Sequence, residues 1–339
     1  MPIAKKDLIH LSDLTVDEIY QIFKKAQEMK EVLAGDDKKH PILRGKSVIN
    51  LFYENSTRTR SSFEFAGKYL GADVVNINTS SSSVMKGESL KDTALTLDRL
   101  NPDVIVMRHG ASGAHEILAS HVKARVINAG DGQHQHPTQA LLDMLTIYEH
   151  KGGFEGLKIA IVGDILHSRV ARSDVWGLQA LGADVTLCAP PTLMPSRADQ
   201  LGAKITYDMD EAIKDADVII MLRIQLERQK SGMFPSIREY ATFYGLNAER
   251  LKLAKPDCLV MHPGPINRGV EITPEVADGV QAVVEEEVDE TELIAVLTAA
   301  VAASMNTSTY NLKIKSFKRV DTNNNVWSSA SRNDAINNY

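Results

Sequence analysis

The chain has 339 residues, of which 43% are hydrophobic and 24% are charged, and its formal net charge is −6. This length exceeds what one hydrophobic core normally serves, so we expect two domains, each large enough to bury a substantial core. The acidic balance disfavours nucleic acid and anionic membranes as partners. Any anion site must therefore come from positive charge that is gathered locally.

Nothing in the sequence resembles a targeting or membrane segment. Residues 1–7 contain no apolar stretch, and no uninterrupted apolar run approaches the ~20 residues that span a bilayer. We therefore expect a cytoplasmic protein that does not contact a membrane.

The predicted elements alternate between helices and strands. A helix is predicted from Thr15 to Lys30, because Thr15 is a favourable N-cap and Glu18 follows at the capping-box position. Another begins with Pro137 and runs to Glu149. Short apolar segments predict strands at 47–53, 73–77, 103–107, 125–128, 158–162, 184–188, 217–222 and 258–261. This alternation indicates the α/β class, with parallel sheets flanked by helices.

The chain divides near residue 150, where Gly152 and Gly153 interrupt the pattern before a second series of strands begins. We therefore expect a first domain over 1–150 and a second over 151–291. Residues 292–313 read as an Ala- and Leu-rich helix, which we expect to cross back to the first domain. Residues 314–339 are polar and aperiodic and are expected to form a disordered tail.

The most informative segment is residues 52–60, which read Phe-Tyr-Glu-Asn-Ser-Thr-Arg-Thr-Arg between an apolar run and an amphipathic one. This pattern predicts a strand, a polar turn and the start of a helix. A helix start offers unpaired N–H groups and the positive end of the macrodipole, and here it also carries hydroxyl and guanidinium groups. The segment therefore predicts a phosphate site.

Ligands of parallel α/β sheets bind beyond the carboxyl ends of the strands, so polar residues that follow each predicted strand are the first candidates. These candidates are Ser56, Thr57, Arg58, Thr59, Arg108, His109, His136, Pro137, Thr138, Gln139, Asp164, His167, Arg169, Arg223, Gln225, His262, Pro263, Gly264 and Pro265. Taken singly, each has a plain structural alternative, such as a solvated arginine, a structural histidine or a rigid turn. The arginines at 58, 108, 169 and 223 would repel one another on one face unless anions compensated them. The occurrence of these four arginines together therefore predicts anionic substrates.

A short repeat links the two halves. The sequence Leu-Gly-Ala-Asp-Val occurs at 70–74 and again at 181–185, and Arg58 and Arg169 precede the two copies at the same distance. Gly-Ala-Asp is a common linker between helix and strand, so the repeat is open to coincidence. Because the arginines match as well, we favour a shared architecture in which each domain aims one arginine at the crevice between them.

Two further segments bear on cofactors and mobility. Residues 80–88 contain a serine run followed by Lys86 and Gly87, which fits either a surface turn or a lid that reaches a phosphate. Residues 163–167 lack the second and third glycines of the dinucleotide-binding pattern. Cys188 and Cys258 are too few for a disulfide framework or a four-ligand zinc site. We expect no cofactor.

Taken together, these motifs resemble the aspartate and ornithine carbamoyltransferases. The resemblance rests on Ser56-Thr57-Arg58-Thr59-Arg60, on Arg108-His109 and on His136-Pro137-Thr138-Gln139. It extends over about residues 1–310, including 82–86, which resemble the mobile loop of the family. It implies that an amine attacks carbamoyl phosphate and that a tetrahedral intermediate expels phosphate, with no metal or organic cofactor at the catalytic site.

The resemblance also implies roles for individual residues. Ser56, Thr57, Arg58 and Thr59 would hold the phosphate, and Arg108 would bridge the phosphate and the carbonyl. His136 would donate to the developing oxyanion together with Arg108 and Thr59. Gln139 and the backbone carbonyls of Pro263 and Gly264 would accept hydrogen bonds from the carbamoyl nitrogen. No side chain is an obvious general base, so the departing phosphate is a candidate for accepting the amine proton.

The acceptor can be argued from charge. Aspartate brings two carboxylates that suit the forks of Arg169 and Arg223 with Gln225 beside them, whereas ornithine brings a second amine that arginine repels. Segments 223–227 and 262–265 resemble the aspartate enzymes, whereas the ornithine enzymes carry Asp-x-x-Ser-Met-Gly and His-Cys-Leu-Pro. L-Aspartate is therefore the predicted acceptor, which implies a step in pyrimidine synthesis. Transfer to ornithine or another amine is the alternative, and a non-catalytic anion-binding protein is a third, less favoured possibility.

Finally, the resemblance implies an assembly. In the family, a serine and a lysine of the mobile loop enter the site of a neighbouring subunit, which corresponds to Ser82 and Lys86 in this chain and implies a homotrimer with shared sites. Lys86 would also contact aspartate. Whether regulatory chains or a dihydroorotase-type partner join the trimer is left open by the sequence.

Overall fold

The computed structural model of the chain describes residues 5–78, 88–224, 236–284 and 290–305. All of these residues lie in one compact unit, Met1–Ser308. The expected tail at 314–339 falls outside the described residues, as do the Ser82 and Lys86 segment and Gln225. None of the helices described is long and apolar enough to cross a bilayer.

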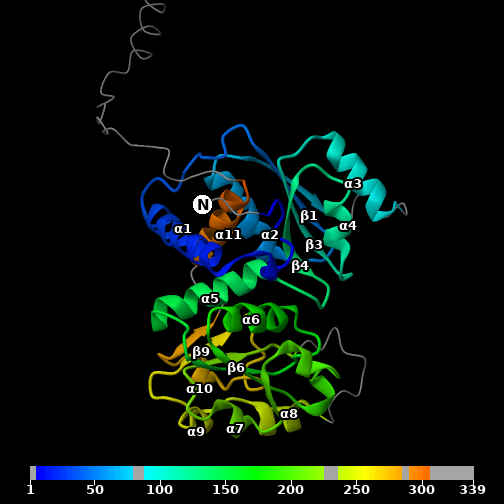
Figure 1. The fold of residues 1–339 in the computed structure, drawn as a ribbon. Coiled ribbons are helices and arrows are strands. Elements are labelled where there is room, and N and C mark those ends of the chain that lie inside the picture. Colours follow the sequence, from blue (N-terminus) through cyan, green and yellow to red (C-terminus); the bar gives the residue numbers. More distant parts are fainter. Residues whose placement is uncertain (1–4, 79–87, 225–235, 285–289, 306–339) are drawn as a thin grey trace, which may run out of the picture. The chain divides into compact units, whose positions relative to one another are not determined.

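The first half of the chain forms a parallel sheet of four strands in the order β2-β1-β3-β4. The strands are β1 (Ser47–Phe52), β2 (Asp73–Asn78), β3 (Val104–His109) and β4 (Arg125–Asp131). All four coincide with predicted strands. Figure 1 shows α3 (Leu90–Arg99) and α4 (Ala114–Ala119) on one face of this sheet and α1 and α2 on the other.

The second half forms a parallel sheet of six strands in the order β10-β9-β8-β5-β6-β7. The strands are β5 (Lys158–Val162), β6 (Asp184–Cys188), β7 (Lys204–Thr206), β8 (Val218–Met221), β9 (Leu259–His262) and β10 (Ala282–Val284). Side chains alternate between the two faces: Ile159 and Ile161 enter one hydrophobic core, whereas Ala160 and Val162 enter another. The predicted α/β class with two domains, each built on a parallel sheet flanked by helices, is confirmed.

The predicted helix starts are confirmed by their caps. At the start of α1 (Val16–Ala34), the Thr15 side chain accepts from the Glu18 N–H and the Glu18 side chain accepts from the Thr15 N–H. The helix α5 (Pro137–Lys151) begins with proline and ends before Gly152, which has φ of 76°. The other helices are α2 (Thr57–Tyr69), α6 (Arg169–Ala180), α7 (Met209–Ile213), α8 (Ile237–Tyr244), α9 (Ala248–Leu251), α10 (Pro274–Ala277) and α11 (Glu290–Ser304).

The repeated Leu-Gly-Ala-Asp-Val sequence makes the same turn in both halves. Gly71 and Gly182 have φ of 79° and 95°, a region that favours glycine. In the first copy, Ala72 N–H donates to the Gly67 carbonyl and Gly71 N–H donates to the Lys68 carbonyl, and the equivalent bonds close the second copy. Both copies therefore end a helix in a Schellman motif and lead directly into a strand.

The last helix returns to the first domain, as expected. α11 packs against α1 and α2, and Figure 1 shows it between them. Its buried hydrophobic residues from Ile294 to Val301 join the core that also contains Phe23 and Leu33 of α1. The predicted helix extends to residue 313, but residues 306–313 lie outside the part of the chain that the structure describes.

Candidate active site

A cavity of about 550 Å³ lies where the carboxyl ends of strands from both sheets meet. Its lining contains the following predicted residues: Ser56, Thr57, Arg58, Thr59, Arg108, His136, Gln139, Arg169, Arg223, Pro263, Gly264 and Pro265. Glu54, Asn55, Ser168 and Val170 also line the cavity, although the sequence analysis assigned them no role. The structure therefore brings together all the candidate site residues in its described part except six from the strand-end list, which are treated below.

The start of α2 forms one wall of the cavity. β1 ends at Phe52, and α2 begins at Thr57 after a short turn. Ser56 is the N-cap residue, but its side chain makes no cap hydrogen bond, whereas Ser168 at the start of α6 caps the Ala171 N–H. The Ser56 hydroxyl and the first N–H groups of α2 are therefore not engaged with one another. This arrangement suits an anion that accepts hydrogen bonds from both.

Arg108 and Arg169 meet at one carboxylate, that of Glu54. Arg108 Nε donates to Glu54 Oε2 at 3.1 Å, and Arg169 Nη2 donates to the same oxygen at 2.8 Å. Arg108 is the penultimate residue of β3 and Arg169 begins α6, so Glu54 links the two halves of the chain. Sequence reasoning missed this role. The sequence offered one signal, which is that Glu54 is the acidic residue in the segment 52–60, whose other charged residues are basic.

Arg223 follows β8 and faces a turn supported by His262. His262 ends β9, is buried, and its Nδ1 accepts a hydrogen bond from the Gly264 N–H at 2.9 Å. Burial and then the positive charges of Arg223 and Arg58 lower the pKa of His262 to about 3. The ring is therefore neutral near pH 7, and it holds the backbone of Pro263 and Gly264 beside the cavity.

The start of α5 supplies His136 and Gln139. His136 is the N-cap residue, and its backbone N–H donates to Ser173 Oγ of α6 at 2.9 Å. Gln139 Nε2 donates to Asp143 Oδ1 at 3.3 Å, one helical turn further on. Both residues are 7% exposed and line the cavity, so this wall is largely shielded from solvent.

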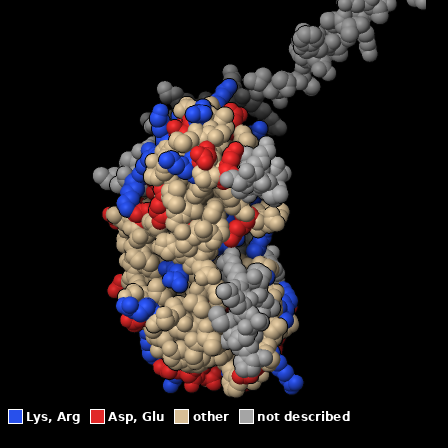
Figure 2. All heavy atoms as spheres, turned by 90° about the vertical axis from the view of Figure 1, so that its right-hand side faces the viewer, with Lys and Arg blue, Asp and Glu red and all other residues tan. Residues whose placement is uncertain are grey.

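Positive charge dominates this cavity. Four arginines line it, and Glu54 is the single acidic residue among its described lining residues. Figure 2 shows acidic and basic residues interspersed over the described part of the face it presents. The attraction for anions is therefore local, because the chain as a whole carries a net charge of −6.

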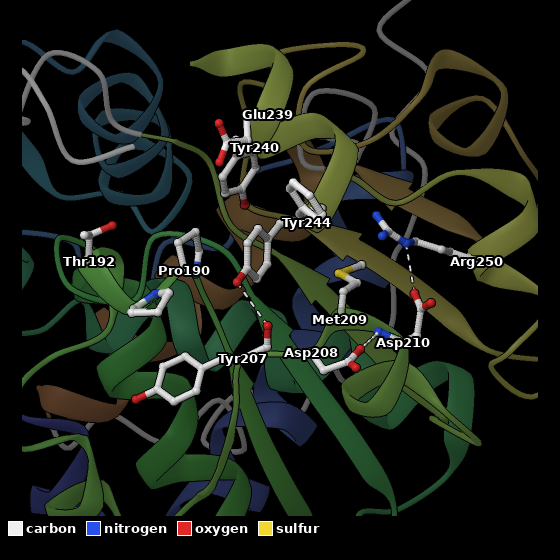
Figure 3. Close-up of a pocket in the computed structure, with 12 residues that line it drawn as sticks. Pro190, Thr192, Tyr207, Asp208, Met209, Asp210, Glu239, Tyr240, Tyr244 and Arg250 are labelled. Atoms are coloured by element: carbon white, nitrogen blue, oxygen red, sulfur yellow. Dashed lines mark hydrogen bonds and ion pairs between the residues drawn. The ribbon is translucent and has the colours of Figure 1, made fainter. Parts of the chain in front are cut away.

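A second cavity of about 580 Å³ differs in character (Figure 3). It lies between α7, α8 and neighbouring loops, and its lining includes the aromatic residues Tyr207, Tyr240, Phe243 and Tyr244. Among its described lining residues, Arg250 is the one arginine, and it donates to Asp210 at 3.0 Å. The described lining of this cavity therefore shows no converging cations of the kind that anionic substrates require.

Six strand-end candidates do not line the first cavity. His109 accepts from the Ala111 N–H at 2.9 Å, and His167 Nδ1 lies 2.8 Å from Asp164 Oδ1. Pro137 and Thr138 are buried in the first turn of α5, and His262 supports the Gly264 backbone from behind. The strand-end rule is therefore wrong for these six residues as cavity residues. A rule based on chain position cannot tell a side chain that turns into the cavity from one that binds its own loop.

The comparison with known proteins covers both halves. Residues 6–149 match the carbamoyl-P binding domain described for aspartate/ornithine carbamoyltransferase, and residues 155–301 match the Asp/Orn binding domain. The chain belongs to the aspartate/ornithine carbamoyltransferase family. The resemblance drawn from the motifs is thereby confirmed.

Relatives within this carbamoyltransferase family include enzymes named for aspartate. The chain is 58% identical to the aspartate carbamoyltransferase catalytic subunit of Moorella thermoacetica, over 85% of this chain and 94% of that protein. It is 59% identical to the protein of the same name from Heliobacterium modesticaldum, over 84% of this chain and 91% of that protein.

Solved carbamoyltransferase structures share the fold whichever amine they are named for. Aspartate transcarbamoylase from Trypanosoma cruzi, in complex with carbamoyl phosphate and aspartate, is 32% identical with a TM-score of 0.77 and matches 90% of this chain and 98% of that chain. Ornithine carbamoyltransferase from Pyrococcus furiosus is also 32% identical, with a TM-score of 0.78 and the same coverage. The fold of the family therefore leaves the acceptor to be argued from the cavity and from sequence.

Proposed function

We propose that the chain transfers the carbamoyl group of carbamoyl phosphate to the amine of L-aspartate, giving N-carbamoyl-L-aspartate and phosphate as an early step of pyrimidine synthesis. One observation carries the proposal: arginines from both sheets converge on one cavity that also contains His136 and Gln139. A site that only held anions would need the arginines but not the amide and imidazole beside them. The relatives named for aspartate support the choice of acceptor.

The phosphate would bind at the start of α2. Ser56, Thr57 and Thr59 offer hydroxyl and N–H donors, and Arg58 offers a guanidinium fork, all on the cavity wall. The positive end of the helix would favour the additional charge that develops on the phosphate as it leaves. In this proposal the first domain, residues 1–150, binds carbamoyl phosphate.

The carbonyl would be activated from two sides. Arg108 would bridge the phosphate and the carbonyl oxygen, and His136 with Thr59 would donate to the oxyanion of the tetrahedral intermediate. Gln139 and the carbonyls of Pro263 and Gly264 would accept hydrogen bonds from the carbamoyl nitrogen and fix its orientation. His262 is a positioning residue in this scheme, because it holds the Gly264 backbone.

The aspartate carboxylates would bind to the second domain, residues 151–291. Arg169 and Arg223 line the same cavity and can each hold a carboxylate through a pair of N–H donors. Gln225 and Lys86 complete this half of the proposal on the basis of the family resemblance, and both lie outside the described residues. A compound that joins a phosphonate to aspartate would then span both halves, as N-(phosphonacetyl)-L-aspartic acid is bound by the Trypanosoma cruzi enzyme.

The chemical step balances without a cofactor. The aspartate nitrogen forms a bond to the carbonyl carbon, the bond from that carbon to the bridging phosphate oxygen breaks, and phosphate leaves with the electron pair. The departing phosphate, which is a base close to the attacking nitrogen, takes the amine proton. No metal or organic cofactor is needed at this site.

The assembly belongs to the proposal as well. A homotrimer would place Ser82 and Lys86 of one chain in the site of its neighbour, in the cytoplasm. Mixing an Arg58→Ala chain with a Lys86→Ala chain, each inactive alone, should restore activity because some sites would then lack both changes. If activity did not return after subunit exchange had been demonstrated, sites would not be shared.

The acceptor is tested by an assay of carbamoyl transfer with aspartate and ornithine side by side. We expect turnover of aspartate and not of ornithine, because an arginine pair attracts the second carboxylate and repels the second amine. Turnover of ornithine without aspartate would overturn the roles of Arg223 and Gln225. Binding of carbamoyl phosphate without turnover of any amine would instead support an anion-binding protein.

A further inference from the structure

Three potential metal ligands meet away from the cavity. His10 lies just before a short 3-10 helix (Leu11–Asp13), Glu116 lies in α4, and His134 lies in the loop between β4 and α5. One donor atom from each lies within 4.8 Å of the other two. His10 Nε2 and Glu116 Oε1 are 3.0 Å apart, and the rings of His10 and His134 meet edge to face with centroids 5.4 Å apart. Segments far apart in the sequence therefore converge on one point.

A buried carboxylate orients His134 for this role. Asp131 is completely buried, and its Oδ2 lies 2.9 Å from Nδ1 of His134. Asp131 Oδ1 accepts from the Gly113 N–H at 3.0 Å, which fixes the carboxylate in place. A carboxylate only accepts, so the proton of the neutral His134 ring lies on Nδ1 and the lone pair lies on Nε2. Metal-binding histidines are commonly oriented by such a carboxylate.

The distances suit a small tetrahedral ion. Zinc binds His nitrogen and carboxylate oxygen at about 2.0–2.2 Å, which places neighbouring ligand atoms about 3.3 Å apart. The pair formed by His10 and Glu116 is already close to that spacing. The side chains of His10, Glu116 and His134 are 25%, 44% and 41% exposed, so rotation can close the remaining gap and solvent can reach the ion.

We propose that His10, Glu116 and His134 bind one Zn²⁺ per chain, with water at the fourth position. Two imidazoles and a carboxylate are a ligand set that this ion favours. The carboxylates of Glu116 and Asp131 supply two negative charges, which match the charge of the ion. The site would be structural, because its ligands are absent from the lining of the proposed catalytic cavity.

The ion would strengthen an existing connection. The Leu11 N–H already donates to Gln135 Oε1 at 3.0 Å, which ties the segment after His10 to the loop that leads into His136. Zinc would add a second connection, because it would join His134 of this loop to His10 and Glu116. The unfolded chain does not hold the three ligands together, so zinc would bind the folded chain in preference. Zinc should therefore raise the melting temperature.

The test is zinc binding by the full-length protein after removal of metals with a chelator. Zinc would be titrated in competition with a chromophoric chelator, and bound metal would be counted by mass spectrometry after dialysis. We expect one Zn²⁺ per chain and a higher melting temperature. Loss of a group that only hydrogen-bonds to a metal ligand weakens metal binding about 10- to 100-fold. Loss of a ligand itself, in Glu116→Gln or His134→Gln, should weaken zinc binding by at least this factor.

The matched control is His40→Gln, which removes a histidine that does not belong to the cluster. This control should bind zinc as the unaltered chain does. Because His134→Gln also removes the bond to Asp131, it could fail to fold, so Glu116→Gln on the surface of α4 keeps the test decisive. Failure of the unaltered chain to retain zinc, or equal binding by the chain and Glu116→Gln, would overturn the proposal. Neither result would affect the proposed transferase activity.

Discussion

Glu54 positions two of the four arginines that line the cavity. It shares one carboxylate oxygen between Arg108 and Arg169, which come from different halves of the chain. It therefore does two things at once: it reduces the mutual repulsion of the arginines, and it holds both guanidinium groups in a fixed orientation. These two effects predict opposite consequences of removing its charge.

We expect the orientation effect to dominate in Glu54→Gln. Hydrogen bonds to charged groups contribute about 1.5–3 kcal/mol, so kcat/KM for carbamoyl transfer should fall about 10- to 100-fold. Steady-state kinetics with both substrates varied would measure the change. Glu211→Gln, which removes a surface carboxylate paired with Lys204, should leave kcat/KM unchanged. A lower KM and undiminished kcat in Glu54→Gln would show that Glu54 merely screens the arginines.

His262 gives the cavity a dependence on pH. Burial, with Arg223 and Arg58, lowers its pKa to about 3, whereas in the unfolded chain a histidine titrates near about 6.5. Between these values the unfolded chain binds a proton that the folded chain does not. The stability that neutral His262 contributes is therefore fully present above about pH 6.5 and is lost as the pH falls toward 3.

The prediction concerns His262→Asn, which keeps an acceptor for the Gly264 N–H but does not titrate. Over the interval from about pH 6.5 downward, the unfolding free energy of the unaltered chain should fall more steeply than that of the variant. The difference should approach about 1.4 kcal/mol per pH unit. Chemical denaturation at several pH values would measure both slopes. Parallel slopes would mean that His262 takes up its proton in the folded chain as readily as in the unfolded chain.

At the scale of elements, the sequence indicated the long helices and central strands but not the shortest pieces. β7 and β10 have three residues each and lie at the two edges of the second sheet. A strand of that length shows too few residues for a period of two to be recognised, and its existence depends on pairing with a neighbour. Caps, by contrast, act locally, which is why the starts of α1 and α5 were predicted from Thr15 and Pro137.

The packing of α5 on α6 contains a pair of buried acids that the sequence did not indicate. Asp174 of α6 is fully buried beside Asp143 of α5, which accepts from Gln139. Burial, and secondly the charge and hydrogen bond of Asp143, raise the pKa of Asp174 well above its usual value. The carboxyl of Asp174 is therefore protonated under conditions where an exposed acid is not, and it can donate to Asp143.

This pair predicts that the unfolding free energy of the unaltered chain falls as the pH rises. Asp174→Asn should remove this fall. As the pH rises above about 3.9, the unfolded chain releases a proton that the folded chain retains, so the native chain loses stability relative to the variant. Asparagine keeps a donor for Asp143 and carries no proton to lose. We expect denaturation curves to show that the unfolding free energy of the variant rises relative to that of the unaltered chain between pH 4 and 7. Asp184 is exposed, so the control variant Asp184→Asn should show no such trend. If the difference in unfolding free energy between Asp174→Asn and the unaltered chain did not change with pH, the raised pKa of Asp174 would be contradicted.

At the scale of the whole molecule, sequence patterns predicted which residues follow the strands but not how the two halves meet. Arg58, Arg108, Arg169 and Arg223 could be selected because each follows a strand and carries a charge that needs an anion. That all four face one cavity depends on packing between the two sheets, which no local pattern encodes. The contact of Glu54 with Arg169 is of this kind, since these residues are 115 positions apart.

The central claim is that one cavity holds a phosphate at α2 and the carboxylates of aspartate at Arg169 and Arg223. The most direct measurement is calorimetric titration of the protein with N-(phosphonacetyl)-L-aspartic acid, alone and in the presence of carbamoyl phosphate. We predict one compound per chain, bound about 100-fold or more tightly than phosphate because both halves are engaged at once, and displaced by carbamoyl phosphate. Binding no tighter than that of phosphate, or binding that carbamoyl phosphate does not reduce, would contradict the account.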